Sequence, residues 1–162
     1  MITVLIASLI GIASWSFAEY AIHHWVGHLG KGKNPFSREH LRHHRDGQFT
    51  PWGRKYLQAF AVALGLFAGV GWAVGWALGT AWSLGFVFAY LLYERTHRRL
   101  HTHAPRNAYG RMLRRHHFSH HFSSAKFNHG VTSVVWDHIF GTYKPPERIR
   151  VPRRLAMPWL LD

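Results

Sequence analysis

The chain has 162 residues, of which 15 are histidine and none is cysteine, and its formal net charge is +13 with the histidines neutral. The absence of cysteine excludes disulfides, thiolate zinc sites, iron–sulfur clusters and thiolate-bound haem. Any bound metal must therefore be held by histidine, carboxylate or backbone oxygen. A large positive charge is common in nucleic-acid-binding proteins, but Lys and Arg are missing from residues 1–30 and 56–94, and this distribution argues against a nucleic-acid partner.

Residues 1–22 form the first apolar segment, and its one charged residue, Glu19, lies near its end. At about 1.5 Å per residue, a helix of this length crosses a bilayer core of about 30 Å. The segment lacks the basic start and the small-residue cleavage site of a secretory signal peptide. It therefore predicts a retained membrane span.

Residues 56–93 form a second apolar block without a charged side chain. As a single helix this block would be roughly 57 Å long, about twice the thickness of the hydrocarbon layer. Two spans, 56–73 and 77–95, with a turn among Gly71, Gly75 and Gly79, fit a bilayer better. The expected fold class is an all-α integral membrane protein with about three transmembrane helices.

Three spans place residues 23–55 and 96–143 on one side of the membrane, together with the Lys, Arg and His residues. Because positively charged loops stay in the cytoplasm, we expect this side to be cytoplasmic and the N-terminus to be outside, in a bacterial inner membrane. We expect these two segments to form a helical cap, and the tail 144–162, too short for a fourth span, to lie on the bilayer surface. The whole chain, 1–162, is then one domain.

The histidines occur in four clusters, HHWVGH, HLRHH, HRRLHTH and HHFSHH, which are followed by His129 and His138. Pairs three or four residues apart share one helix face, so two imidazoles can bind one ion or lie across two ions. A single such pair usually belongs to a solvated helix face, and a basic surface can simply contact phosphates. Four similar clusters at one membrane depth instead favour metal binding.

The number of imidazoles indicates how many ions to expect. A structural zinc ion is satisfied by four ligands, and roughly twice that number or more is available here. We therefore expect two ions. Imidazole suits zinc, copper and non-haem iron, and a redox-active pair of ions against a membrane favours oxygen chemistry with iron.

The sequence resembles the fatty acid hydroxylase and sterol desaturase superfamily, and within it the fatty acid 2-hydroxylase branch. The similarity covers about residues 19–143 and follows the order of the family's motifs. The matching strings are EYAIHHWVGH, HLRHH, YLLYERTHRRLH, LRRHHFSHHF and HGVTSVVWDHIFGT. The resemblance implies ten metal ligands: His23, His28, His40, His43, His44, His97, His101, His117, His120 and His121.

The first of these ligands conflicts with ideal helix geometry. His24 and His28 are four residues apart and share a face, whereas His23 and His28 are about 140° apart on an ideal helix. Family spacing favours His23 and periodicity alone favours His24. We follow the family, and expect that a helix end at Gly27, or ligation from two sides, relieves the geometry.

The resemblance also implies the chemistry. Two iron ions would use O2 and two external electrons to hydroxylate a C–H bond of a lipid acyl chain, at the 2-position of a fatty acid or sphingolipid-type acyl group. Zinc could replace iron during isolation, since histidine sites bind it at least as tightly. The sequence has no cytochrome, flavin or ferredoxin segment, so the electrons would come from a separate, acidic protein that docks on the Arg-rich face.

Other residues are candidates for supporting roles. Five could orient the ligands by hydrogen bonding: His24, His116, Asp137, Glu19 and Glu94. Three aromatic residues could wall the acyl channel: Phe122, Trp136 and Phe140. For the acidic residues a structural cap is an equal alternative, and for the aromatic residues an anchor at the membrane interface.

Two other functions stay open. A carotenoid ring hydroxylase would share the histidine pattern and the metal chemistry, although the WDHIFGT and EYAIH strings favour the acyl branch. A membrane protein that uses zinc and histidine without catalysis is the alternative from a different class, and it would show no iron-dependent O2 consumption.

Overall fold

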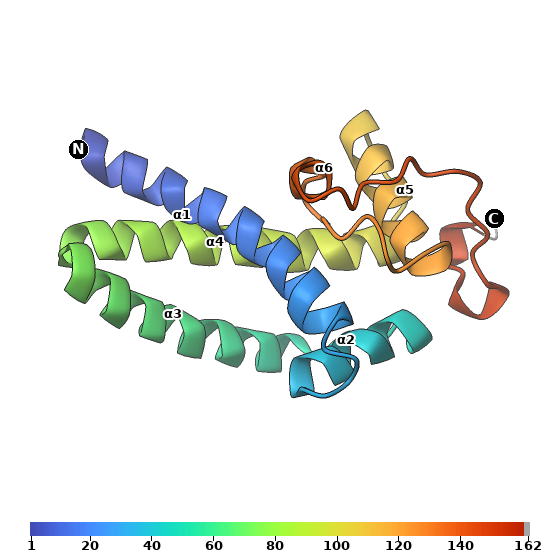
Figure 1. Ribbon diagram of the computed structural model, residues 1–162, viewed down its shortest axis with the longest axis horizontal. Coiled ribbons are helices and arrows are strands. Elements are labelled where there is room, and N and C mark those ends of the chain that lie inside the picture. Colours follow the sequence, from blue (N-terminus) through green and yellow to red (C-terminus); the bar gives the residue numbers. More distant parts are fainter. Residues whose placement is uncertain (161–162) are drawn as a thin grey trace. The chain divides into compact units, whose positions relative to one another are not determined.

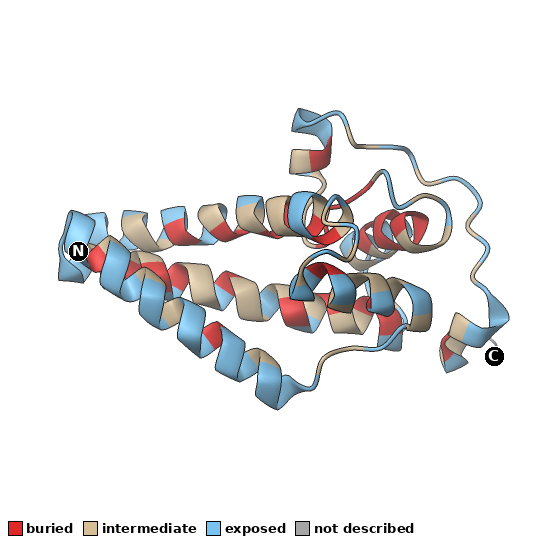
Figure 2. Ribbon diagram, turned by 60° about the horizontal axis from the view of Figure 1, so that its bottom comes forward, coloured by how far each residue is buried: buried red, intermediate tan, exposed pale blue. Residues whose placement is uncertain are grey.

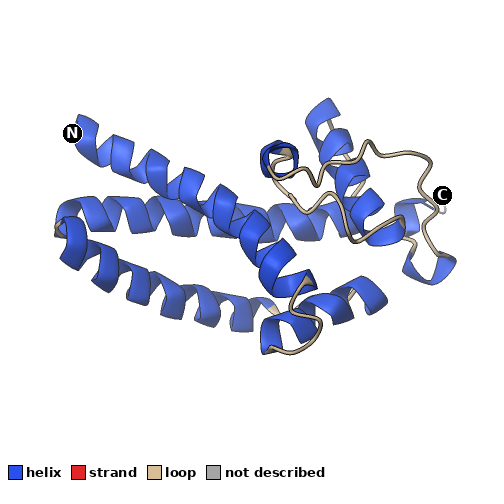
Figure 3. Ribbon diagram, viewed as in Figure 1, coloured by secondary structure: helices blue, strands red, loops and turns tan. Residues whose placement is uncertain are grey.

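The computed structural model describes residues 1–160, and this part of the chain consists of helices and loops, with no strand (Figures 1 and 3). The expected all-α fold is confirmed. The elements are α1 (Ile2–Ala21), the π-helix η1 (Ile22–His28), α2 (Pro35–Asp46), α3 (Trp52–Val74), α4 (Trp76–Thr102), α5 (Ala108–Phe122), α6 (Val135–Ile139) and the short 3-10 helices η2 (Arg153–Leu155) and η3 (Pro158–Leu160).

The chain divides into two compact units. The first, here called the span unit, comprises Met1–Ala18 and Thr50–Tyr93; the second, the histidine unit, comprises Glu19–Phe49 and the chain from Glu94 onward. The boundaries fall inside α1 and α4, so each of these helices contributes to both units.

Three helices are long and apolar enough to cross a membrane: Ile2–His28, Trp52–Val74 and Trp76–Thr102. They overlap the spans expected from the sequence and extend beyond them. Gly75 makes the turn between α3 and α4, and its φ of 91° lies in the region that only glycine adopts without strain. The expected hairpin is therefore present, with its turn at the middle glycine.

Glycines allow α1 and α4 to approach closely within the span unit. A Cβ atom added to Gly11 would lie 2.0 Å from the carbonyl oxygen of Trp82, and one added to Gly85 would lie 2.1 Å from that of Ser8. Trp15 packs beside this crossing, edge-on to Phe86. Since no side chain fits between the two backbones at these points, the crossing depends on glycine, as is common for membrane helices.

Helix α3 leaves most of its side chains exposed (Figure 2). Leu57, Phe60 and Trp72 are among the large apolar residues on its surface. An apolar surface of this extent is unusual on a water-soluble protein. A hydrocarbon environment suits it, because the helix satisfies its backbone hydrogen bonds internally.

In the histidine unit, asparagine residues begin α2 and α5, the two helices that carry six of the ten histidines named from the sequence as ligands. The side chain of Asn34 accepts a hydrogen bond from the N–H of Ser37 at the start of α2, and Asn107 accepts one from the N–H of Gly110 at the start of α5. Side-chain acceptors at this position stabilise a helix by about 1 kcal/mol. Gly47, with φ of 68°, ends α2.

The interior of the histidine unit is unusually polar. Large apolar residues such as Tyr20, Leu113 and Val131 are buried there, but imidazoles and carboxylates outnumber them. The buried histidines are His23, His43, His97, His101, His116, His117, His120 and His129. A buried polar group destabilises the fold unless it has partners. These side chains therefore need hydrogen bonds or a bound metal ion to offset their burial.

The C-terminal tail packs in part on the histidine unit. Met157 is buried, and the guanidinium carbon of Arg114 on α5 lies 4.1 Å from the ring centroid of Trp159. The tail was expected at the bilayer surface, and that placement stays a prediction. The structure adds that some of its apolar side chains contact the protein.

Candidate metal centre

The ten histidines named from the sequence converge in two groups within the histidine unit. Group one consists of His23, His28, His40, His44 and His120, and group two consists of His43, His97, His101, His117 and His121. Within each group the candidate ligand nitrogens all lie within 4.8 Å of one another. Two opposite ligands on one ion, each at about 2.0–2.1 Å, are about 4 Å apart, so either group is compact enough to surround a single ion.

Helical spacing decides how the histidines are shared between the groups. On α2, His40 and His44 are four residues apart and join group one, while His43 points into group two. Residues four apart lie on the same helix face, and their neighbour is about 100° away around the axis. Helix α5 shows the reverse arrangement, with His117 and His121 in group two and His120 in group one. Each of these helices therefore contributes to both groups.

The conflict over the first ligand is resolved by a π-helix. Residues Ile22–His28 form the π-helix η1, whose hydrogen bonds run from i to i+5. In this geometry His23 and His28, five residues apart, face the same way, and both join group one. The expected relief by a helix end at Gly27 was wrong, because the π-helix runs through it. His24 lies outside both groups.

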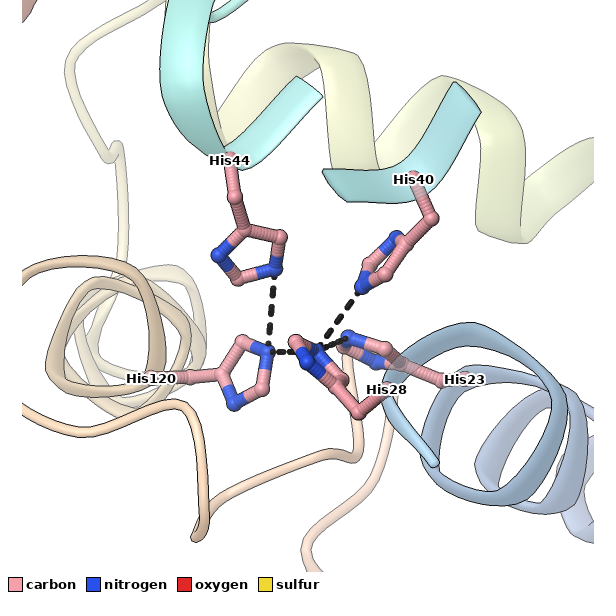
Figure 4. A group of neighbouring side chains, drawn as sticks. All are labelled: His23, His28, His40, His44 and His120. Carbon is pink, nitrogen blue, oxygen red and sulfur yellow. Dashed lines mark hydrogen bonds between the residues drawn. The ribbon is translucent and has the colours of Figure 1, made fainter. Parts of the chain in front are cut away.

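The Nε2 atoms of group one meet at its centre (Figure 4). His28 Nε2 lies 2.8 Å from that of His40, 2.9 Å from that of His120 and 3.3 Å from that of His23. One nitrogen cannot share a proton with three others at once. Two nitrogens that bind the same ion at about 2.0–2.1 Å are about 2.9 Å apart at a right angle and about 3.4 Å apart at a tetrahedral angle. The observed spacing therefore fits ligands of one ion.

Group two has the same geometry. His43 Nε2 lies 3.1 Å from that of His97, and His101 Nε2 lies 2.8 Å from that of His117. His121 Nε2 is buried without a hydrogen-bond partner. Buried polar atoms rarely lack a partner, and an ion bound by the group would supply one.

Backbone carbonyl oxygens fix the outward-facing nitrogens. His43 Nδ1 donates to Gln48 O at 3.1 Å, and His120 Nδ1 donates to Phe127 O at 2.7 Å. His23 Nδ1 likewise donates to the carbonyl oxygen of His129. A carbonyl oxygen only accepts, so the proton sits on Nδ1, and the lone pair of Nε2 is left to face the group.

Burial keeps these imidazoles neutral. It lowers the pKa of His44 to about 2, and neighbouring imidazoles add to the effect. Burial followed by contact with other histidines also lowers the pKa of four further residues well below its ordinary value: His40, His117, His120 and His121. Metal binding requires neutral imidazole, which these groups supply at neutral pH.

Asp137 and His116, both expected as orienting residues, form a buried pair. His116 Nε2 lies 2.9 Å from Asp137 Oδ2, and Asp137 also accepts from the N–H groups of His129 and Gly130 and from Thr142 Oγ1. Burial alone raises the pKa of Asp137, but these hydrogen bonds outweigh it and hold the pKa below its ordinary value. His116 is not part of either group.

The other two acidic candidates lie on α1 and α4. Glu19 is buried and accepts hydrogen bonds from the N–H groups of Val131 and Thr132. Glu94 is buried and lies 3.7 Å from Arg98, whose guanidinium stacks over Phe49. Phe49 in turn packs against His97 and His101 of group two.

His129 was not named as a site residue, yet it is fully buried beside group one. Its ring stacks on His24 with centroids 4.0 Å apart, and it lies 5.1 Å from the ring of His120. Burial first, and then His24 and His28, lower its pKa to about 3. His24 itself is 3.2 Å from the hydroxyl of Tyr20 through Nδ1. No spacing rule links residue 129 to the clusters, so sequence reasoning had no signal for it.

The three aromatic candidates lie in two places. Phe122 contacts the ring of His121 beside group two, with centroids 5.7 Å apart. Phe140 stacks on Tyr20 at 5.1 Å, and Trp136 lies 6.3 Å from Phe140. Phe140 is largely exposed and Trp136 is half-buried.

Comparison with known proteins identifies the family of this chain. The profile of the fatty acid hydroxylase family matches residues 8–142. The chain is 32% identical over 146 residues to a ceramide very long chain fatty acid hydroxylase of Schizosaccharomyces pombe, which covers 85% of this chain and 42% of the relative. It is 43% identical over 37 residues to the protein of the same description from Saccharomyces cerevisiae, covering 23% of this chain and 10% of that one.

A solved structure shares the fold. It is described as full-length scs7p with only the hydroxylase domain visible, and it superposes with a TM-score of 0.70 at 24% identity, covering 92% of this chain and 59% of that one. The chain spans less than half the length of the curated relatives that it matches. With three apolar helices long enough to cross a membrane and fatty acid hydroxylases as relatives, it is an integral membrane protein. Since the family profile covers most of the sequence, the chain belongs to the fatty acid hydroxylase family.

Proposed function

We propose that this protein is a membrane-bound, iron-dependent monooxygenase that hydroxylates the acyl chain of a lipid. The observation that carries the proposal is the convergence of ten imidazoles into two groups of five, in a chain that belongs to the fatty acid hydroxylase family. The five imidazoles of each group would hold one ion. The donor set consists of neutral nitrogen atoms, which suits iron or zinc.

When bound, the two iron ions would supply the chemistry by which O2, two electrons and two protons convert a C–H bond into C–OH and release the other oxygen atom as water. The protein's own residues hold and orient the ions. The Nδ1–H groups of His23, His43 and His120 are tied to backbone carbonyls, so their rings cannot rotate freely. Preorganisation of this kind keeps the ligands in place while the charge on the ions changes.

We propose the 2-position of a fatty acid or sphingolipid-type acyl group as the site of hydroxylation. The support is the description of both curated relatives as ceramide fatty acid hydroxylases. Phe122, Trp136 and Phe140 are proposed to contact the acyl chain. Phe122 lies beside His121 of group two, and Phe140 and Trp136 form an aromatic surface with Tyr20. An apolar chain gains free energy by leaving water for such surfaces.

We propose that the electrons come from a separate acidic protein. Helices α2 and α5 carry ligands for both groups and also expose arginines, including Arg38, Arg42, Arg111 and Arg115. A donor that docks on these arginines would be close to the ions. Its reduction rate should fall as salt is added, because screening weakens long-range attraction. A rate that does not depend on ionic strength would contradict this partner.

The positive charges also support a cytoplasmic position for the histidine unit, with the N-terminus outside, in a bacterial inner membrane. We expect zinc in some preparations in place of iron, because the same imidazoles bind zinc at least as tightly as ferrous iron.

Lipid mass spectrometry on cells that express either the wild type or His121→Ala tests the proposed function. We expect 2-hydroxylated acyl chains only with the wild type, while both proteins insert into the membrane. Hydroxylated carotenoids without hydroxylated acyl lipids would contradict the acyl substrate. If neither lipid class changes, the enzyme assignment is wrong and a metal-binding role without catalysis takes its place.

A further inference from the structure

Four consecutive backbone N–H groups in the loop between α5 and α6 are bound by two buried carboxylates. The N–H of His129 donates to Asp137 Oδ1 at 2.7 Å, and that of Gly130 donates to Asp137 Oδ2 at 2.8 Å. The N–H groups of Val131 and Thr132 both donate to Glu19 Oε1, at 2.6 and 2.8 Å. The loop is therefore held along its length by carboxylates from two elements, α1 and α6.

The same loop bears directly on group one. The carbonyl oxygen of His129 accepts the proton of His23 Nδ1. Glu19 and His23 are four residues apart, at the end of α1 and in η1. Glu19 therefore binds the loop one helical turn away from the histidine that the loop orients.

Asp137 uses both oxygens of its carboxylate to hold this arrangement. Its carboxylate is buried and accepts four hydrogen bonds, from two backbone N–H groups, His116 Nε2 and Thr142 Oγ1. A carboxylate is the one side chain of this size that accepts at all four positions. Gly130 allows the close approach, since an added Cβ would lie 1.8 Å from the carbonyl oxygen of Ser133.

We propose that Glu19 and Asp137 are positioning residues for the metal in group one: they clamp the segment His129–Thr132 so that the His129 carbonyl aims His23 at the ion. The proposal rests on the proposed function, since it requires that group one binds a metal. The two carboxylates should affect the ion in group one and not the ion in group two. The segment that they hold is hydrogen-bonded to His23 of group one, and neither carboxylate is hydrogen-bonded to a histidine of group two.

The test is a zinc titration of the purified, metal-free protein in detergent, in competition with a chelator. Asp137→Asn keeps the size of the side chain but turns an NH2 group toward an N–H donor, because each carboxylate oxygen accepts from a backbone N–H. Glu19→Met keeps the length of the side chain at the other end but removes the oxygen that accepts from Val131 and Thr132. Loss of an outer hydrogen-bond partner typically weakens metal binding by about 10- to 100-fold. We expect this loss for one of the two zinc ions in each variant, while the other ion binds as in the wild type.

A double-variant cycle separates positioning from a general loss of structure. In the His23→Ala background the loop has no imidazole to orient, so adding Asp137→Asn should weaken zinc binding no further. Asp46→Asn is the matched control, since Asp46 is a carboxylate at the end of α2 that pairs with Arg45. The Asp46→Asn variant should bind both zinc ions with wild-type affinity.

Several outcomes would overturn the proposal. Wild-type affinity for both ions in Asp137→Asn and Glu19→Met would contradict it while leaving the proposed function intact. Equal weakening of both ions, or full additivity with His23→Ala, would show that the carboxylates only maintain the fold. A wild-type protein that binds no zinc would contradict this proposal and the proposed function together.

Discussion

Removing two imidazoles from one group should cost the protein one metal ion and not two. The double variant His28→Ala/His40→Ala leaves three histidines in group one and five in group two. The pair His101→Ala/His117→Ala does the reverse. We expect each double variant to retain about one ion per chain after dialysis against a chelator where the wild type retains two, and the fourfold variant to retain none, because an ion that loses two of its five imidazole ligands is held less tightly.

The loss should also appear in stability. An ion present at about 100 times its dissociation constant stabilises the folded state by about 2.7 kcal/mol, so each double variant should lose about that amount. The ion content is measured by elemental analysis after dialysis, and stability by thermal unfolding in detergent. His103→Ala/His138→Ala, which removes two exposed histidines outside both groups, should leave both quantities unchanged. If either double variant loses both ions, the two groups are not independent and the reasoning fails.

Further predictions concern packing and pH. Gly11→Ala should destabilise the folded protein by about 1–3 kcal/mol in detergent unfolding, because the added carbon would lie 2.0 Å from the Trp82 carbonyl oxygen. Gly65→Ala is the control and should be neutral or stabilising, because no atom lies within 4 Å of the added carbon. Equal effects of the two substitutions would contradict the close crossing of α1 and α4. The metal-free protein should lose stability as the pH falls from 6.5 toward about 3, because the buried ring of His129 has its pKa lowered to about 3. Between these pH values the unfolded chain binds more protons than the folded one. The free energy of unfolding therefore falls by up to about 1.4 kcal/mol per pH unit for each such imidazole. An unfolding temperature that is the same at neutral and at acidic pH would refute this sign.

Hydropathy and local periodicity were sufficient for part of the structure. The apolar runs predicted three helices of membrane-spanning length, and the glycine-rich stretch around Gly75 predicted the hairpin turn, because both are local properties of the chain. The four-residue spacing of His40 and His44 predicted a shared helix face, and the structure places them in one group.

What could not be predicted depends on contacts between distant residues. An ideal α-helix separates His23 from His28, and the sequence gives no sign of the π-helix that brings them together. The carbonyl of residue 129 reaches His23 across more than a hundred residues of sequence, so no local pattern identifies it. Asp137 was expected to orient imidazoles directly, whereas the structure shows it bonded to His116 and, through backbone N–H groups, to the loop that orients His23.

If the two histidine groups support insertion of oxygen from O2 into a lipid acyl chain, the oxygen atom of the new hydroxyl group comes from O2 and not from water. The most direct test supplies isotopically heavy O2 to cells that express the protein and locates the label in extracted lipids by mass spectrometry. We expect heavy oxygen in a hydroxyl group on the acyl chain, at the carbon next to the carbonyl, and none in cells that express His121→Ala. A hydroxyl oxygen that comes from water, or labelled lipid at the same level with His121→Ala, would contradict it.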